Sequence, residues 1–225
     1  MSALIRIPLL LLTIFVGSVP AKAGIIINEV LADPPSGLAG DANGDGIRNG
    51  IQDEFVELVN TSATALDISG WTISDGIGTR HQFDAGTVIY AYAAILVFGG
   101  GAPYEFFSGA QAFTASTGVL GLNNSGDQVS LFDAMSSPID AMTYGAEGND
   151  DQSLTLDPEL DWTGAAFVRH ATATGSRGAA LSPGTRVDGT PFGPAEVPEP
   201  GPLLLIELGL CYFTLKKPSQ IRKSG

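Results

Sequence analysis

Residues 41–54 hold a pattern of oxygen-bearing side chains that suggests metal chemistry. Asp41, Asn43 and Asp45 alternate along the chain, as positions one, three and five of a calcium-binding loop require, and Gly46 supplies the sharp turn that follows. Alternate residues of a tight loop point their side chains at one centre, and Ca²⁺ binds several oxygens at once. The candidate ligands are Asp41, Asn43, Asp45, Ile47 through its carbonyl, Asn49, Asp53 and Glu54. The pattern predicts a calcium site.

The end of this loop departs from the helical EF-hand pattern. Gln52 stands where a bidentate glutamate is expected at position twelve, and Asp53 and Glu54 follow it. The loop therefore resembles those of dockerins and thrombospondin-type repeats. The missing ligand implies an affinity of the extracellular type, on the order of 10⁻⁴ to 10⁻³ M. The alternative is a hairpin loop with ordinary turn chemistry, because Asn, Gly and Asp favour turns in any case.

The sequence offers little support for catalysis. The chain has two histidines, His81 beside Arg80 in a predicted strand and His170 in a late polar segment. Neither lies in a metal-binding or nucleophile motif, and a serine nucleophile needs a positioned base. We therefore predict two histidines without catalytic partners and no enzymatic activity. The alternative is an exported hydrolase of the esterase, phosphatase or nuclease type with an unrecognised site.

The charge of the chain argues against one class of ligand, and its cysteine content excludes one source of stability. Residues 24–200 carry 23 of the 24 acidic residues and five basic residues, all arginines, which gives this part a net charge of −18. Such a charge argues against nucleic-acid binding, because phosphates would be repelled. The same part contains no lysine, and the chain's single cysteine, Cys211, lies outside it. An apolar core rather than a disulfide must therefore stabilise this domain.

The elements that carry these residues are predicted to be short strands. Apolar or alternating segments are separated by clusters of Gly, Asn, Asp and Ser, and sustained helical periodicity is found only near the two termini. The predicted strands are 24–31, 54–60, 65–74 with a bend at 69–70, 87–99 with strand or turn at 90–92, 128–133, 138–144, 152–156 and 162–169. This pattern favours an all-β sandwich or barrel.

The strand sequences also resemble a known family. The segments IIINEVLADP, DEFVELVNTSATALDISGWTISDG and the late SPGTRVDG are similar to bacterial lamin tail domains. The resemblance implies an immunoglobulin-like β-sandwich over residues 24–188, with Trp71 in its core. Glu29 and Glu57 are expected to cap strand ends or to hydrogen-bond exposed loops, and a metal role for either is the alternative.

The first 23 residues have the layout of a secretory signal peptide. Arg6 precedes an apolar run over residues 7–16, and Ala21-Lys22-Ala23 forms a small-residue cleavage signal, with Ala21 and Ala23 as its key positions. The apolar run is too short for a lasting membrane span. Residues 1–23 are therefore predicted to form a signal helix and to be removed on export.

The C-terminal end contains a second targeting signal. Residues 189–197 form a Gly/Pro linker, and residues 198–225 begin with Pro198-Glu199-Pro200, which follow Val197 and precede an apolar run over 203–215 and a basic tip. This order resembles the PEP-CTERM sorting signal. The resemblance implies processing by an exosortase-type enzyme, membrane attachment through the C-terminal helix before processing, and a Gram-negative host.

Two features of the apolar run over residues 203–215 disfavour its insertion into a membrane as a helix. The run of 13 residues reaches only about 20 Å as a helix, against a hydrocarbon core of roughly 30 Å. Glu207 lies inside it, so insertion is expected to be marginal. The sequence thus predicts a precursor anchored in the inner membrane and then a cell-surface or extracellular-matrix protein, whose partners are exopolysaccharide or surface proteins.

Overall fold

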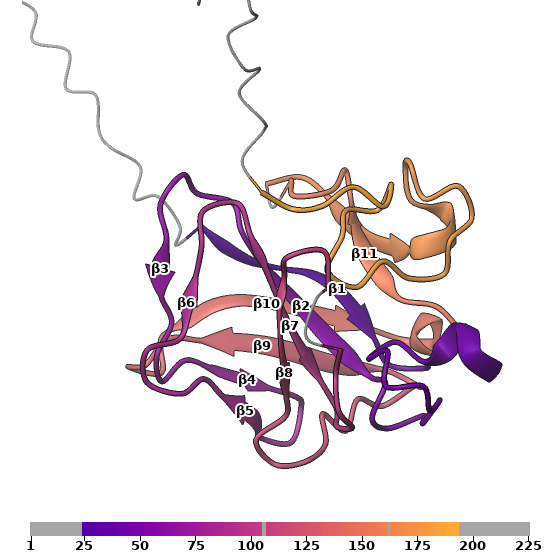
Figure 1. Ribbon diagram of the computed structural model, residues 1–225, viewed down its shortest axis with the longest axis horizontal. Coiled ribbons are helices and arrows are strands. Elements are labelled where there is room, and N and C mark those ends of the chain that lie inside the picture. Colours follow the sequence, from indigo (N-terminus) through magenta and orange to yellow (C-terminus); the bar gives the residue numbers. More distant parts are fainter. Residues whose placement is uncertain (1–23, 105–106, 162, 194–225) are drawn as a thin grey trace, which may run out of the picture. The chain divides into compact units, whose positions relative to one another are not determined.

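The computed structural model describes residues 24–104, 107–161 and 163–193, all of which belong to one of the chain's two units, residues 1–193 (Figure 1). The predicted signal helix, the sorting tail with its apolar helix and the end of the linker lie outside the described residues. Within the described part, no helix is long and apolar enough to cross a membrane.

The described chain is almost entirely β-structure with short turns. Its strands are β1 (Ile25–Leu31), β2 (Phe55–Asn60), β3 (Leu66–Asp67), β4 (Thr72–Ser74), β5 (Thr79–Gln82), β6 (Val88–Ile89), β7 (Ala94–Phe98), β8 (Gln111–Thr114), β9 (Asp127–Phe132), β10 (Pro138–Tyr144), β11 (Leu154–Asp157) and β12 (Ala166–Arg169). The short 3₁₀ helices are η1 (Gly37–Gly40), η2 (Ala146–Asn149) and η3 (His170–Thr172). The all-β prediction is confirmed.

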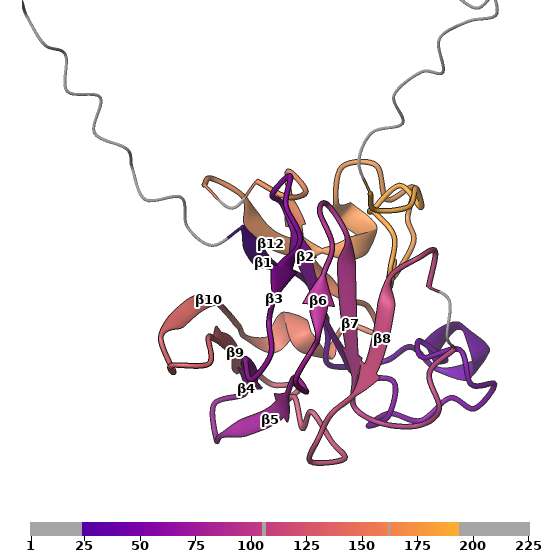
Figure 2. The same cartoon turned by 60° about the vertical axis from the view of Figure 1, so that its left-hand side comes forward.

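Two main sheets form the sandwich. The larger sheet has the order β12-β11-β1-β2-β7-β8, and the smaller has the order β10-β9-β4-β5 (Figure 1). All pairs are antiparallel except β7 and β8, which run parallel and lie side by side in Figure 2. A third pair, β3 with β6, extends from one end. This arrangement is consistent with the immunoglobulin-like sandwich that the resemblance implies.

The main core lies between the two sheets. Ile27 and Val56 from the larger sheet pack in one buried cluster with Ile73 and Leu131 from the smaller one. Trp71 belongs to the same cluster and is almost fully buried, which confirms its predicted place in the core. Burial of this apolar surface is the main source of stability.

The larger sheet is buried on its other face as well. Phe55, Leu96 and Phe98 form a second buried cluster. Leu181 and Phe192, from residues 181–193, which we call the C-terminal segment, pack against this cluster. Because both faces are covered, β1, β2 and β7 are buried along their whole length. Polar side chains on these central strands are therefore forced into the interior and must find partners there.

Candidate functional site

The two central strands place a pair of carboxylates in the interior. Glu29 on β1 and Glu57 on β2 are direct partners in the antiparallel register, and neither side chain is exposed. Along β2, Glu57 alternates with Val56 and Leu58 of the main core, so it lies on the face that the C-terminal segment covers.

Both carboxylates hold that segment to the sheet. The backbone N–H of Ser182 donates to Glu29 Oε1 over 2.9 Å, and the N–H of Gly184 donates to Glu57 Oε2 over 2.8 Å. Asn28 Nδ2 donates to the other oxygen of Glu57 over 2.9 Å. These glutamates do hydrogen-bond a loop, but the prediction of an exposed loop is wrong, because the bonded residues Ser182 and Gly184 are buried.

His170 belongs to the same network. Its Nε2 lies 2.8 Å from Ser182 Oγ, which lies 2.6 Å from Glu29 Oε2, and the hydroxyl of Ser153 donates to Glu29 Oε1 over 2.6 Å. His170 is fully buried. The prediction that the histidines lack partners is wrong for His170, which contacts Ser182, 12 residues further on, and through it reaches Glu29 on β1.

A backbone carbonyl and a serine hydroxyl hold the imidazole ring of His170 from its two sides. His170 Nδ1 lies 2.8 Å from the carbonyl oxygen of Ala179, which only accepts, so Nδ1 carries a hydrogen. The hydroxyl of Ser182 lies against Nε2 and donates to Glu29 Oε2, so this hydroxyl links the ring to the carboxylate.

The arrangement differs from a hydrolytic triad. In a triad the histidine lies between serine and carboxylate, so that it can take the proton of the serine hydroxyl. Here Ser182 lies between His170 and Glu29, and His170 Nε2 is 3.9 Å from Glu29 Oε2. Glu29 and His170 are fully buried, and Ser182, in the C-terminal segment, is only 8% exposed, so the three groups are out of reach of a substrate. The network is suited to fixing that segment.

Burial shifts the pKa of the Glu57 carboxyl. Loss of water, and next the charge of Glu29, raise the pKa of the Glu57 carboxyl well above its ordinary value, while the bonds from Asn28 and Gly184 act in the opposite direction.

The second histidine has a different environment. His81 on β5 pairs with Ile73 on β4 and is almost fully buried, with its ring packed edge-on against Phe83 at 4.5 Å between centroids. The hydroxyl of Ser116 lies 3.1 Å from its Nδ1. Burial lowers the pKa of His81, which favours the neutral form of its ring. It is a cross-strand residue of the core.

The predicted calcium loop is organised by backbone hydrogen bonds. Asp53 is central to it, because its two oxygens accept from the N–H groups of Asn43 over 3.1 Å and Asn49 over 2.6 Å. Asp45 accepts from Ile47 and Asn43 accepts from Asp45, as in Asx turns. Asp53 and Asn43 are fully buried, so the loop is a fixed part of the domain.

The loop retains features that a cation would satisfy. Asp41 Oδ1 is buried and accepts no hydrogen bond from the described residues. The pKa of Asp53 is raised first by burial and in part by the charges of Asp41 and Asp45, so three carboxylates repel one another here. In the described part of the chain, no three acidic, histidine or cysteine side chains converge closely enough to hold a metal by themselves. Amide and carbonyl oxygens of the loop would have to supply the remaining ligands of a bound cation.

Glu54 lies apart from the other predicted ligands. Its Oε2 accepts from the N–H of Leu122 over 3.2 Å, and Arg80 and Asp127 are its charged neighbours. The carboxylate of Asp53 is bonded within the loop, to the N–H groups of Asn43 and Asn49, whereas that of Glu54 is bonded to Leu122. Asp53 is therefore the one of the two that is placed to complete a shell in the loop.

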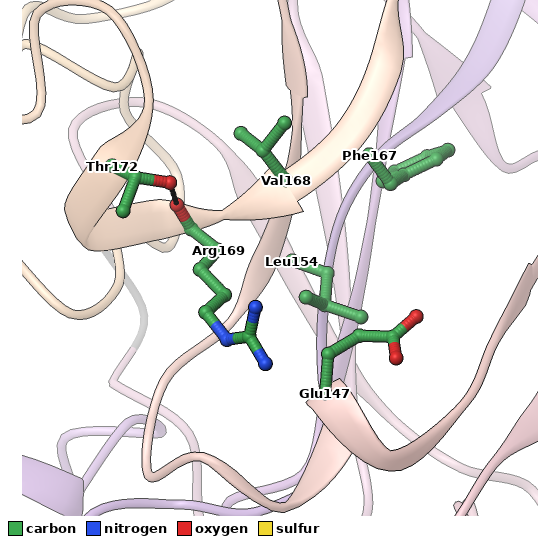
Figure 3. Close-up of a pocket in the computed structure, with 6 residues that line it drawn as sticks. All are labelled: Glu147, Leu154, Phe167, Val168, Arg169 and Thr172. Atoms are coloured by element: carbon green, nitrogen blue, oxygen red, sulfur yellow. Dashed lines mark hydrogen bonds between the residues drawn. The ribbon is translucent and has the colours of Figure 1, made fainter.

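A surface cavity of about 380 Å³ lies beside the edge strand β12 (Figure 3). It is lined by Glu147, Leu154, Phe167, Val168, Arg169 and Thr172. The Arg169 guanidinium donates to Asp150, and the Thr172 hydroxyl donates to the Arg169 carbonyl over 2.8 Å. The pKa of Glu147 is lowered, chiefly by the N–H of Gly145. An ionised carboxylate and a paired arginine favour binding over acid–base catalysis.

Comparison with known families agrees with the fold. The lamin tail domain family matches residues 18–146. This range covers β1 to β10 and the calcium-loop candidate, and ends before the late SPGTRVDG segment. No curated protein shows a significant match to the chain. Since the matched range spans more than half of the sequence, the chain belongs to the lamin tail domain family.

Proposed function

We propose that this chain is an exported, non-catalytic binding or structural module of the cell surface or of an exopolysaccharide matrix. The order of its segments carries the proposal: a signal-peptide layout, one acidic β-domain, a Gly/Pro linker, the Val197–Pro200 motif, an apolar run and a basic tip. An exosortase-type enzyme would process the precursor, which the C-terminal helix would hold in the inner membrane of a Gram-negative cell.

Two observations support a non-catalytic role. His81 is packed into the core, and His170 is buried beneath the C-terminal segment. The exported-hydrolase alternative gains from the contact of His170 with Ser182 and Glu29, but the order of these groups and their burial argue against it. Loss of turnover of an ester, phosphate or glycan substrate in a folded His170→Ala variant would favour the hydrolase.

Processing is expected at the C-terminal motif. Material released from the cell surface should end near Pro198-Glu199-Pro200 and should lack Cys211, because the motif immediately precedes the apolar run. Mass spectrometry of the released protein measures this end directly. Glu199→Ala should leave the full-length chain in the membrane fraction, whereas Glu196→Ala, just before the motif, should not. Recovery of intact residues 216–225 in released protein would contradict the proposal.

We further propose that the 41–53 loop binds calcium, with Asp41, Asn43, Asp45, Asn49, Asp53 and the Ile47 carbonyl as its ligands. The buried, unpaired oxygen of Asp41 and the mutual repulsion of three carboxylates support this proposal. The ion would lock the loop and relieve the repulsion.

Calcium is therefore expected to stabilise the domain. The gain follows RT ln(1 + [L]/Kd) and amounts to about 1.4 kcal/mol when free calcium is tenfold above Kd. Thermal unfolding with and without ~10 mM Ca²⁺ measures it, given an expected Kd on the order of 10⁻⁴ to 10⁻³ M. Asp45→Ala should abolish the gain and Asp84→Ala, an exposed carboxylate elsewhere, should keep it. An unchanged melting temperature in the parent would rule out the site.

A further inference from the structure

Two segments of this acidic domain contain no charged residue. Residues 58–66 and 85–104 have no acidic or basic side chain, although residues 24–200 carry 23 acidic residues. The β2–β3 connection and the β6–β7 turn, which belong to these two segments, lie at the same end in both views (Figures 1 and 2). We call residues 61–65 and 90–93 the tyrosine platform.

A buried asparagine joins the two halves of the platform. The side-chain amide of Asn60 donates to the carbonyl oxygens of Thr64 over 2.8 Å, Ile89 over 3.2 Å and Tyr90 over 3.0 Å. Its Oδ1 accepts from the N–H and hydroxyl of Ser62. Asn60 is fully buried, and so its side chain fixes both turns in one geometry.

This platform presents two aromatic rings to solvent. Tyr90 is 64% exposed and Tyr92 is 37% exposed. Tyr92 has a φ of 57°, in the left-handed region that costs a bulky residue energy, and its N–H donates to the carbonyl of Ser62 over 3.3 Å. The neighbouring exposed residues are small, Ala63, Thr64 and Ala65. A strained tyrosine at a position where glycine would fit without cost suggests that the ring itself is needed.

We propose that the tyrosine platform binds a neutral polysaccharide chain. One face of a pyranose ring presents C–H groups that pack on an aromatic face, while the sugar hydroxyls can bond to the Thr64 hydroxyl and the tyrosine hydroxyls. Tyrosine provides this amphipathic contact at low entropic cost. The inference deepens the proposed binding role and rests on it.

The net charge of the domain and the small area of the platform favour a neutral polysaccharide over an anionic polymer or a protein. The net charge of −18 repels an anionic polymer, and the platform has no cation to compensate. A stable protein interface needs about 800 Å² on each partner with a well-packed apolar core. Two exposed tyrosines among alanines and threonines make a smaller and more polar surface than this, which suits a sugar chain.

The test is binding of neutral hexasaccharides to the full chain in mild detergent. β-1,4-linked glucose, β-1,3-linked glucose and β-1,4-linked mannose serve as probes, with calorimetry as the readout and an anionic oligouronate as the comparison. At least one neutral probe should bind and the oligouronate should not. Tyr90→Ala should weaken binding about tenfold or more, as loss of a central aromatic contact does.

Matched variants separate binding from folding. Tyr92→Gly should weaken binding while the melting temperature stays unchanged or rises, because glycine adopts a φ of 57° without steric cost. Tyr104→Ala, a tyrosine of similar exposure (59%) on another loop, should bind like the parent. Absence of binding to every neutral probe, equal binding by Tyr90→Ala, or concentration-dependent dimerisation that Tyr90→Ala abolishes would overturn the proposal. Export and processing are measured without any glycan, so failure here leaves the proposed localisation intact.

Discussion

Replacing Glu29 by alanine is expected to lower the free energy of unfolding by about 3–5 kcal/mol, because three buried donor groups lose their acceptor and each unsatisfied donor costs roughly 1–3 kcal/mol. The substitution leaves the N–H and hydroxyl of Ser182 and the hydroxyl of Ser153 without their acceptor, and leaves His170 beside an apolar gap. Because a domain of this size is stable by only about 5–15 kcal/mol, the loss is a large fraction of the total.

Denaturant unfolding of the purified chain measures this loss. Asp84→Ala, at an exposed carboxylate, serves as the control and should change stability by less than about 0.5 kcal/mol. Glu29→Ala should also increase proteolytic cleavage within residues 182–193, since Ser182 and Gly184 are held by the paired glutamates. A loss below about 1 kcal/mol, or unchanged cleavage, would show that Glu29 does not hold the segment.

A second large effect is expected from pH. Burial raises the pKa of Glu54 from its ordinary 4.5 to about 7. The folded state therefore binds the proton more tightly than the unfolded chain, so this contribution is fully present below pH ~4.5 and is lost as the pH rises through about 7. A difference of about 2.5 pKa units corresponds to roughly 3 kcal/mol. Glu57, whose pKa is also raised, acts in the same direction.

Unfolding free energies measured between pH 4.5 and 8.5 test this expectation. Glu54→Gln keeps an acceptor for the Leu122 N–H but cannot ionise, so its stability should decline much less over that range. Glu147→Gln is the matched control, because the pKa of Glu147 is lowered and its titration lies below the window. If the parent and Glu54→Gln decline equally, Glu54 is not the group responsible.

The positions of most strands could be read from local sequence. The apolar and alternating segments near 24–31, 54–60, 128–133 and 138–144 became β1, β2, β9 and β10 with small shifts in their ends. The bend at 69–70 separates β3 from β4, where Gly70 has a φ of 74°. These features depend on side-chain periodicity and turn chemistry, which a short window of sequence contains.

Strand β8 could not be read in this way. Gln111–Thr114 is short and only partly buried, so its sequence shows little alternation. It forms a strand because Ile95 to Phe98 of β7 offer a free edge, with which it pairs in parallel across a long connection. Such a pairing depends on the neighbour rather than on the segment's own residues.

The sequence by itself determined that this chain is an all-β, acidic domain between two targeting-like termini, since composition, periodicity and terminal motifs are local properties. It placed Glu57 on one face with Phe55 and Val59, but both faces of β2 are buried, so alternation could not say what the carboxylate meets. Only the tertiary structure decided that Glu29 and Glu57 hold a segment more than 120 residues away and that His170 joins them. Buried polar groups must be paired, and their partners are chosen by how distant segments come together in three dimensions.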